Sequence, residues 1–175
     1  MLDALEPRWF AVYTKYKREK LVSKYLQDKG VTSYLPLQTV TRMYTRKIKK
    51  IELPLINCYV FVQITKDQYV PVLETPDVVN FVKIAKDLIA IPEAEIEILR
   101  RVTGDITNVE VDKGVFKIGE EVEIISGSLF GLRGRLLQGL GSKNFVIELE
   151  NLGYSLRMQM APEILRPLPG TRGAA

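Results

Sequence analysis

The sequence contains no histidine and only one cysteine, and these absences exclude several kinds of catalytic site. Without histidine, Cys-His and Ser-His nucleophile pairs cannot form, and a zinc site would have to do without its usual ligand types. The chain has no Gly-rich phosphate loop of either standard spacing, and no pair of carboxylates placed for acid–base work. We therefore predict a protein that is not an enzyme and that holds neither a metal nor a cofactor.

The chain also lacks long apolar runs and the cysteines needed for an internal disulfide. The lone Cys58 fits a reducing compartment, and no apolar stretch approaches the length that crosses a bilayer. Residues 1–7 lack the basic-then-apolar order of a signal peptide. We predict a cytoplasmic protein with no membrane partner.

Charge is distributed unevenly along the sequence. Residues 1–65 hold 12 Lys and Arg against 5 Asp and Glu, a balance of +7, whereas residues 66–175 hold 13 against 16, a balance of −3. Such asymmetry indicates a polyanionic partner for the basic half. The alternative is an ordinary solvated surface whose charges happen to cluster.

The run Leu53–Val62 is the most informative stretch, because it begins as a Pro-marked loop and becomes a strand of β-branched and aromatic residues. Tyr59 and Phe61 are two residues apart and must leave the same face of that strand. Two large aromatics on one face either fill a core or form an open patch for a partner.

The residues before this strand predict a strand, a basic turn and a helix. Residues 8–14 have β propensity, residues 15–20 are basic, and apolar residues then recur at helical spacing until Gly30 stops the helix. Residues 31–37 are extended, and residues 38–53 alternate as a hairpin with its tip near 45–47. The hairpin carries five cations: Arg42, Arg46, Lys47, Lys49 and Lys50.

The residues after the central strand predict a short helix over 65–73 despite Pro71, a strand over 78–84, and a helix that starts at Ile91-Pro92-Glu93. The periodicity then lapses, so we place a linker at 104–117. The first domain is predicted to be 1–103.

The C-terminal part is different in kind. Short strands separated by Gly and Asn turns predict a small β-barrel over 118–168, followed by a disordered tail over 169–175.

With both parts in view, the chain resembles the NusG family of transcription elongation factors. The resemblance covers nearly the whole chain and implies an α+β protein: an N-terminal NGN domain, mainly an antiparallel sheet flanked by helices, followed by a C-terminal KOW barrel. The residues that carry it are Trp9 to Val12, Leu55 to Val62, Val79 to Val82, Ile91-Pro92, Val122 to Gly127, Phe130-Gly131 and Gly134.

The central motif departs from the commoner family pattern. That pattern reads Phe-Pro-Gly-Tyr, and this chain reads Ile56-Asn57-Cys58-Tyr59. The change resembles the specialised paralogues RfaH and especially the UpxY group, which implies antitermination at selected operons rather than general action. In the barrel, Ser128 stands where the KOW motif usually has Pro.

The resemblance implies that the NGN domain docks on the clamp helices of the large RNA polymerase subunit and promotes processive transcription. Tyr59 and Phe61 match the family's docking positions, and Tyr13, on the neighbouring first strand, is a third candidate. Aromatic residues recur as interface anchors. The alternative is that they fill the core between sheet and helix.

The basic turn matches the region by which specialised relatives approach the non-template DNA strand. Its cations can neutralise phosphates, and Tyr16 can stack on an unpaired base. The alternative is a solvated helix start, although cations at a helix N-terminus oppose the helix dipole. The candidate nucleic-acid-binding residues are Lys15, Tyr16, Lys17, Arg18 and Lys20.

For the barrel, the resemblance implies a second partner, a small-subunit ribosomal protein or the termination factor Rho. Phe130 is the candidate anchor, and the alternative is that it closes one end of the barrel. β-Branched residues and several glycines disfavour the helical hairpin that the corresponding domain of RfaH can adopt.

A different function class also fits a KOW barrel: an RNA-binding protein of translation or ribosome assembly. Such a protein is expected to be basic in the barrel itself. Residues 118–168 hold five Arg and Lys against six Glu, which disfavours direct clamping of ribosomal RNA.

Overall fold

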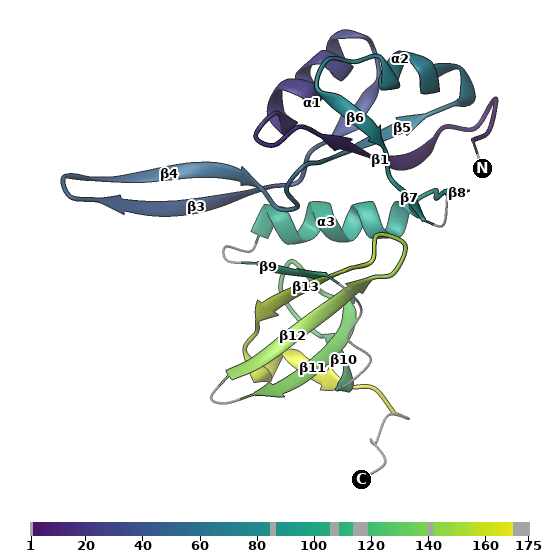
Figure 1. Cartoon of the computed structure of the whole chain (residues 1–175). Coiled ribbons are helices and arrows are strands. Elements are labelled where there is room, and N and C mark those ends of the chain that lie inside the picture. The colour runs from purple at the N-terminus through teal and green to yellow at the C-terminus, as the bar shows by residue number, and fades with distance from the viewer. Residues whose placement is uncertain (1, 85–86, 106–108, 114–118, 140–141, 170–175) are drawn as a thin grey trace. The chain divides into compact units, whose positions relative to one another are not determined.

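The computed structural model describes residues 2–84, 87–105, 109–113, 119–139 and 142–169 (Figure 1). The chain divides into two compact units, Met1–Leu99 and Arg100–Ala175. Each unit is described by itself below. In the described residues, no helix is both long enough and apolar enough to span a membrane.

The N-terminal unit is organised around an antiparallel sheet with the strand order β2-β5-β1-β6. The two central strands, β1 and β5, pair over six positions from Arg8↔Ile64 to Tyr13↔Tyr59. The central strand predicted from the sequence is thus confirmed. The strands are β1 (Arg8–Thr14), β2 (Thr32–Tyr34), β5 (Tyr59–Ile64) and β6 (Val78–Phe81).

The first face of this sheet is covered by α1 (Glu19–Asp28) and α2 (Tyr69–Leu73). The β-branched residues of β5 and the Phe10 and Val12 side chains of β1 meet Val22 and Leu26 of α1 in one buried cluster. The Tyr69 ring stacks on Phe81 with centroids 4.6 Å apart. The apolar residues that recur at helical spacing in α1 and at strand spacing in β1 and β5 thus pack together in one core.

The predicted helix boundaries agree with local chemistry. Helix α1 ends before Gly30, whose φ of 75° is a conformation that glycine adopts without strain. Helix α2 follows the 3-10 turn η1 (Lys66–Gln68), so Pro71 lies within the first turn of α2, where a missing N–H is tolerated.

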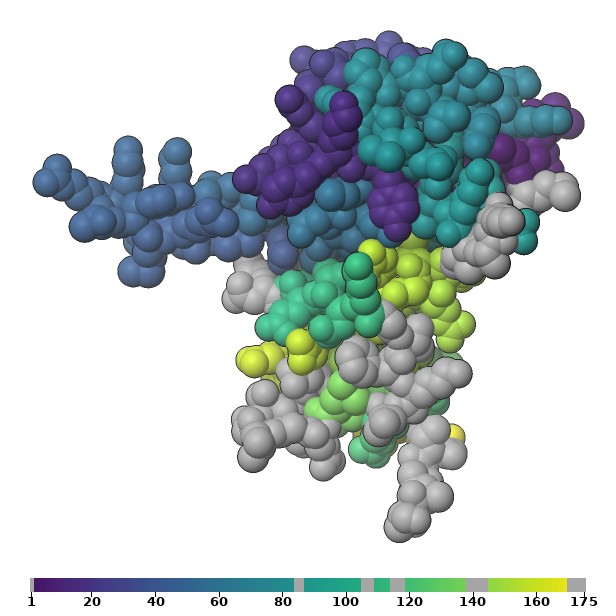
Figure 2. Space-filling model, viewed as in Figure 1, coloured from purple at the N-terminus to yellow at the C-terminus, as the bar shows by residue number. Residues whose placement is uncertain are grey.

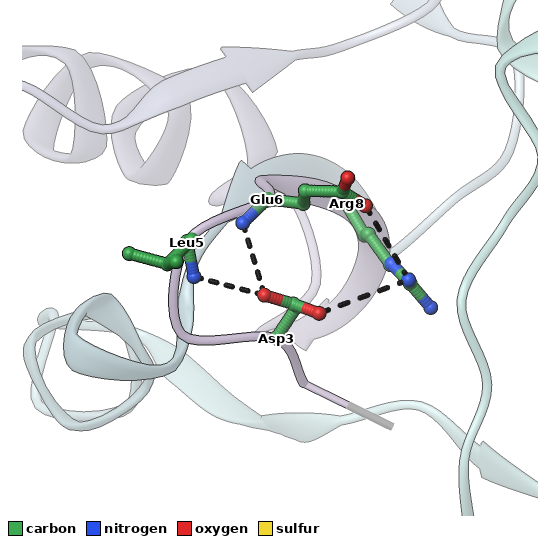
Figure 3. A network of polar contacts seen from close by, with 4 residues as sticks. All are labelled: Asp3, Leu5, Glu6 and Arg8. Atoms are coloured by element: carbon green, nitrogen blue, oxygen red, sulfur yellow. Dashed lines mark hydrogen bonds and ion pairs between the residues drawn. The ribbon is translucent and has the colours of Figure 1, made fainter.

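The N-terminal segment before β1 is held by Asp3 (Figure 3). Its Oδ1 accepts hydrogen bonds from the backbone N–H groups of Leu5 and Glu6, at 2.9 and 3.1 Å. These bonds are the main reason that the pKa of the Asp3 carboxyl is lowered, and the Arg8 guanidinium adds to the effect. The Asp3 carbonyl also accepts the N–H of Lys66, which ties this segment to the start of η1.

The second face of the sheet carries the odd-numbered residues of β1 and β5. Trp9 lies at one end of this face, where it pairs with Ile91 and where its indole N–H donates to the Glu93 carboxylate. Glu93 is in the first turn of α3 (Glu93–Asp105), as the Ile91-Pro92-Glu93 sequence predicts. The short strands β7 (Lys83–Ile84) and β8 (Asp87–Leu88) form a separate pair.

A two-stranded ribbon extends away from the N-terminal sheet (Figure 1). It consists of β3 (Leu37–Tyr44) and β4 (Lys47–Pro54), joined by the two residues Thr45 and Arg46. The hairpin predicted over 38–53 is therefore confirmed, including its tip.

The C-terminal unit contains a six-stranded antiparallel sheet of order β14-β10-β11-β12-β13-β9. The described residues leave β14 and β9 as edges of this order, so the predicted closed barrel is not confirmed. The short turn η2 (Pro162–Ile164) precedes β14. The strands are β9 (Glu110–Lys113), β10 (Glu120–Ile124), β11 (Arg133–Gly139), β12 (Ser142–Leu149), β13 (Tyr154–Gln159) and β14 (Leu165–Pro167).

Gly134 allows β11 and β12 to lie close together. A Cβ atom at this position would lie 2.4 Å from the Val146 carbonyl oxygen and 2.7 Å from the Phe145 ring. Phe145 is fully buried, so the ring has no room to give way. Gly134, one of the residues that carry the family resemblance, thus lies within β11 and has a steric reason to be glycine.

The stretch predicted as a linker, 104–117, contains regular structure. Helix α3 extends to Asp105, and β9 pairs with β13. The structure does not describe 106–108, 114–118 or 170–175, so the disordered tail remains a prediction from residue 170 onward.

Candidate functional site

Three loops meet where β1 ends, at Thr14. The Thr14 N–H donates to the carbonyl of Cys58 at 2.9 Å, and the Lys15 N–H donates to the carbonyl of Asp77 at 3.0 Å. The basic turn that follows Thr14 therefore lies beside the loops that precede β5 and β6.

Each of these loops contains a strained residue. In the described part of the chain, the non-glycine residues with positive φ are Lys17 at 61°, Cys58 at 64° and Asp77 at 67°. A side chain in this region costs roughly 1–2 kcal/mol relative to ordinary conformations. Strained backbone persists where surrounding structure enforces it, and it concentrates at functional sites. Three such residues at one end of a sheet indicate a functional surface there.

The positive φ of Cys58 explains why the commoner family pattern has a glycine at this position. Cys58 occupies the place of the glycine in Phe-Pro-Gly-Tyr, and its positive φ is the conformation that glycine adopts without penalty. The chain therefore keeps the glycine-like backbone after losing the glycine.

Acidic residues hold several cations of the basic turn in place. Asp77 forms ion pairs with Lys15 at 3.0 Å and with Arg18 at 3.8 Å. Lys20 pairs with Glu52 on β4 at 3.5 Å. Because both partners in each pair remain partly exposed, these contacts orient the cations more than they stabilise the fold.

Tyr16 and Lys17 form the outermost part of the turn. Tyr16 is 67 % exposed, and the Lys17 ammonium lies 5.2 Å from the centroid of its ring. A flat exposed ring with a cation beside it suits an unpaired base and its phosphate. The five predicted nucleic-acid-binding residues thus lie in one turn and the first helical turn after it.

Glu19 offsets part of the unfavourable charge at the start of α1. Its side chain is buried, and its Oε1 accepts the Cys58 N–H at 2.8 Å. A carboxylate in the first turn of a helix is favoured by the helix dipole. Burial raises the pKa of the Cys58 thiol, and the negative charge of Glu19 raises it further.

The predicted polymerase-binding aromatics all lie on the second face of the sheet, but their exposure differs. The rings of Tyr13 and Tyr59 meet edge to face at 4.7 Å, and the Tyr59 hydroxyl donates to the Tyr13 hydroxyl at 2.7 Å. Tyr13 is 40 % exposed, Tyr59 is 5 % exposed, and Phe61 is fully buried beside Tyr34. Tyr13 is therefore the member that a partner can touch directly in this structure.

Phe130 lies on an exposed loop of the C-terminal unit. Phe130 is 64 % exposed, which disfavours the alternative that its ring closes one end of the barrel. The guanidinium of Arg101 donates to the carbonyl oxygens of Ser128 and Phe130, both at 2.8 Å. The loop backbone is thus fixed while the ring remains accessible.

In the part of the chain that the structure describes, no group of three or more Cys, Asp or Glu side chains is arranged to hold a metal ion.

Two features of this site were not predicted from the sequence. The acidic partners Asp77 and Glu52 are far from the basic turn along the chain, and the positive φ values fall on residues other than glycine. The only sequence signal was the Thr75-Pro76-Asp77 turn, since Asp tolerates the left-handed region better than most residues.

The sequence model described as "Transcription termination factor nusG" matches residues 7–100, which is more than half of the chain. The chain belongs to the NusG family. The match covers the sheet, both of its covering helices, the ribbon and the basic turn, so the tyrosine pair and the basic turn lie within the matched residues, whereas the Phe130 loop lies outside them.

One solved structure shares the fold of this chain. A structure titled "Domain interaction in Thermotoga maritima NusG" matches with a TM-score of 0.57 at 20% identity, covering 93% of this chain and 97% of that one. A structure titled "Crystal Structure of MjSpt4:Spt5 complex conformation A" matches at 20% identity with a TM-score of 0.31, covering 91% of this chain and 97% of that one. No curated protein matches the sequence.

The raised pKa of the Cys58 thiol predicts slow alkylation. At pH 8 a raised pKa leaves a smaller thiolate fraction, so folded protein is expected to react with iodoacetamide more slowly than protein unfolded in urea. Glu19→Gln removes the negative charge while keeping an oxygen that can accept the Cys58 N–H, and it is expected to lower the pKa and speed the reaction.

Mass spectrometry over a pH series measures this directly, because Cys58 is the only thiol in the chain. Equal rates for the Glu19→Gln and parent proteins at every pH would show that the Glu19 charge does not act on Cys58.

Proposed function

We propose that this NusG-family protein is a transcription elongation and antitermination factor that docks on RNA polymerase through its N-terminal unit. The observation that carries the proposal is the family match over residues 7–100, together with the partly exposed Tyr13 in that region. Docking on the clamp helices would favour processive transcription. The family match does not favour the alternative role in translation or ribosome assembly.

The proposed polymerase contact is centred on Tyr13. This ring presents large apolar area with few rotatable bonds, and Tyr59 holds it through the edge-to-face contact and the hydroxyl pair. Phe61 lies on the same face of the sheet but is fully buried, so its role is in packing and not in direct contact with a partner. A partner helix that packs on Tyr13 would extend the apolar surface already formed by Tyr59.

The proposed contact with non-template DNA uses the basic turn. Tyr16 offers a stacking surface and Lys17 lies beside it, while Lys15 and Arg18 are held in position by Asp77. Lys20 extends the same cationic surface toward the ribbon. A DNA phosphate would take over part of the pairing that Lys15 and Arg18 make with Asp77. The new ion pairs would be stronger, because a phosphate can accept several charge-assisted hydrogen bonds.

Action at selected operons is supported by the central motif. Ile56, Asn57 and Cys58 lie in the loop that contacts the end of β1, next to the basic turn, and Tyr59 begins β5. A change in this motif therefore falls where a DNA strand would be read. This placement supports an UpxY-like or RfaH-like specialisation.

The C-terminal unit is proposed to be a KOW domain that recruits a further partner through Phe130. The Arg101 contacts that fix the loop backbone would reduce the entropy lost when a partner packs on this ring. A small-subunit ribosomal protein and Rho are the proposed partners.

Truncation of Tyr13 tests the polymerase contact. Tyr13→Ala is expected to weaken binding to purified core RNA polymerase by about tenfold or more, the usual cost of losing an aromatic anchor. Phe130→Ala is a matched control, because it removes an exposed ring from the other unit and is expected to leave the affinity unchanged. Biolayer interferometry gives both affinities, with circular dichroism to confirm folding.

Equal affinities for the Tyr13→Ala and parent proteins would contradict docking through this face. Binding to ribosomal subunits in place of polymerase would overturn the antitermination proposal as a whole.

The Asp77 ion pairs provide an independent test of DNA binding. Asp77→Asn removes the competing carboxylate, and Asn accepts the positive φ of this position. The variant is expected to bind single-stranded DNA about two- to tenfold more tightly at low salt, because Lys15 and Arg18 become available to phosphates. Fluorescence anisotropy with a labelled oligonucleotide measures the change.

The double variant Tyr16→Ala, Lys17→Ala should show the opposite effect. If the Asp77→Asn variant binds no more tightly than the parent while the double variant keeps full affinity, the basic turn is a solvated surface only.

A further inference from the structure

The backbone of Cys58 is hydrogen-bonded on both sides of residues 15–18, which connect β1 to α1. Its carbonyl oxygen accepts the Thr14 N–H at 2.9 Å, and its N–H donates to the Glu19 carboxylate at 2.8 Å. Thr14 is the last residue of β1, and Glu19 is the first of α1. The loop before β5 and the basic turn are therefore held against each other as one surface.

Glu19 positions this loop without forming part of the surface, because it is only 3 % exposed. Cys58 has a φ of 64°, a conformation that residues other than glycine adopt where surrounding contacts enforce it. The two hydrogen bonds of Cys58 are such contacts. The loop backbone is thus fixed next to the turn before any ligand arrives.

Asn57 is the exposed residue of this fixed loop. Leu55 and Ile56, which precede it, are buried and anchor the loop in the core. Asn57 itself is exposed, and its Cα lies about 3.8 Å from that of Cys58, as in any trans peptide. An amide side chain is therefore available beside the basic turn, on a backbone that is held from both directions.

The other loop that borders the turn, residues 74–77, has no comparable side chain. Thr75 is buried, and its hydroxyl donates to the Pro71 carbonyl. The Asp77 carboxylate is engaged in two ion pairs. The remaining two residues are a proline and an exposed glutamate, which would repel a phosphate. Within these two loops, Asn57 is the exposed residue whose side chain can both donate and accept hydrogen bonds.

The surroundings of Asn57 suit a nucleic-acid strand. The residues of the turn and of α1, purple in Figure 2, lie at the surface of the N-terminal unit beside the blue ribbon. Tyr16 is exposed there with the Lys17 ammonium next to its ring. A base that stacks on such a ring keeps its edges open to a neighbouring side chain.

We propose that Asn57 reads the identity of one unpaired base in the DNA strand bound by the basic turn, and that it prefers adenine. Its amide offers a donor beside an acceptor. Adenine presents the matching pair on both its Watson–Crick and its Hoogsteen edge, whereas each other base does so on one edge at most. The inference rests on the proposed single-strand contact and adds the residue that gives this contact a sequence preference.

The position of Asn57 also agrees with action at selected operons. In the commoner family pattern, Phe-Pro-Gly-Tyr, the corresponding residue is proline, whose side chain can neither donate nor accept a hydrogen bond. The exchange of proline for asparagine adds that capacity beside the turn. Because Cys58 keeps the positive φ that suits the glycine, the shape of the loop does not have to change with it.

Base preference in the full chain tests the proposal. The ligands are labelled thymine oligonucleotides of about 12 residues with one central adenine or cytosine, and fluorescence anisotropy at about 0.1 M salt gives the affinities. The parent is expected to bind the adenine oligonucleotide at least about fivefold more tightly than the cytosine one. Asn57→Ala is expected to bring this ratio close to one while phosphate contacts keep both affinities within about threefold.

Asn57→Asp gives a sharper test, because it keeps the shape of the side chain and replaces its donor by an acceptor. A carboxylate accepts from the amino group of cytosine but repels the ring nitrogens of adenine. The adenine-to-cytosine ratio is therefore expected to fall to one or to reverse.

The matched control is Asn80→Asp. It adds the same charge at the same end of the sheet, at an exposed position opposite Tyr13, and keeps an oxygen that can accept the Phe81 N–H. This variant is expected to weaken binding to both oligonucleotides equally and to leave the ratio as in the parent. Melting temperatures close to that of the parent confirm that all variants are folded.

A parent protein that binds both oligonucleotides with equal affinity would overturn base reading by Asn57 and would leave the proposed single-strand contact standing. The same ratio for the Asn57→Asp and parent proteins would also overturn it. If the parent binds neither oligonucleotide, the proposed DNA contact itself fails. Loss of RNA polymerase affinity in Asn57→Ala, with an unchanged base ratio, would assign Asn57 to the polymerase contact.

Discussion

The pairing of β1 with β5 is the constraint on which the N-terminal unit depends. Six consecutive residue pairs fix the register, and a shift by one residue would move every side chain to the opposite face. Phe10 and Val12 of β1 then join the core beneath α1 and α2, while Trp9, Ala11 and Tyr13 lie on the second face. Because the middle of this sheet is used for packing, surfaces for partners are left at its end.

The end of the sheet combines strain, charge and aromatic surface. The register brings Tyr13 beside Tyr59. The loops after β1, before β5 and before β6 supply Lys17, Cys58 and Asp77 in strained conformations. Two acids, Asp77 and Glu52, hold cations that lie outside the core. Such an arrangement positions charges before a partner arrives, so less conformational entropy is lost on binding.

The sequence predicted the local elements well because their signals are local. Strand alternation located the ribbon and its tip, the apolar run located β5, Pro92 marked the start of α3, and Gly30 marked the end of α1. The period of two also placed Tyr59 and Phe61 on one face. Alternation does not indicate whether a face is covered, and for this reason the burial of Phe61 was not predicted. The Asp77 and Glu52 partners depend on tertiary contacts that no local pattern encodes.

The central claim is that partners meet the protein at the Tyr13 end of the sheet, and hydroxyl-radical footprinting of the full chain on an RNA polymerase elongation complex tests it most directly. Tyr13 and Tyr16 are predicted to lose reactivity on binding, while Val70 and Leu73, exposed on α2, keep theirs. Unchanged reactivity of Tyr13 and Tyr16 in the bound protein, with protection confined to α2, would contradict the account.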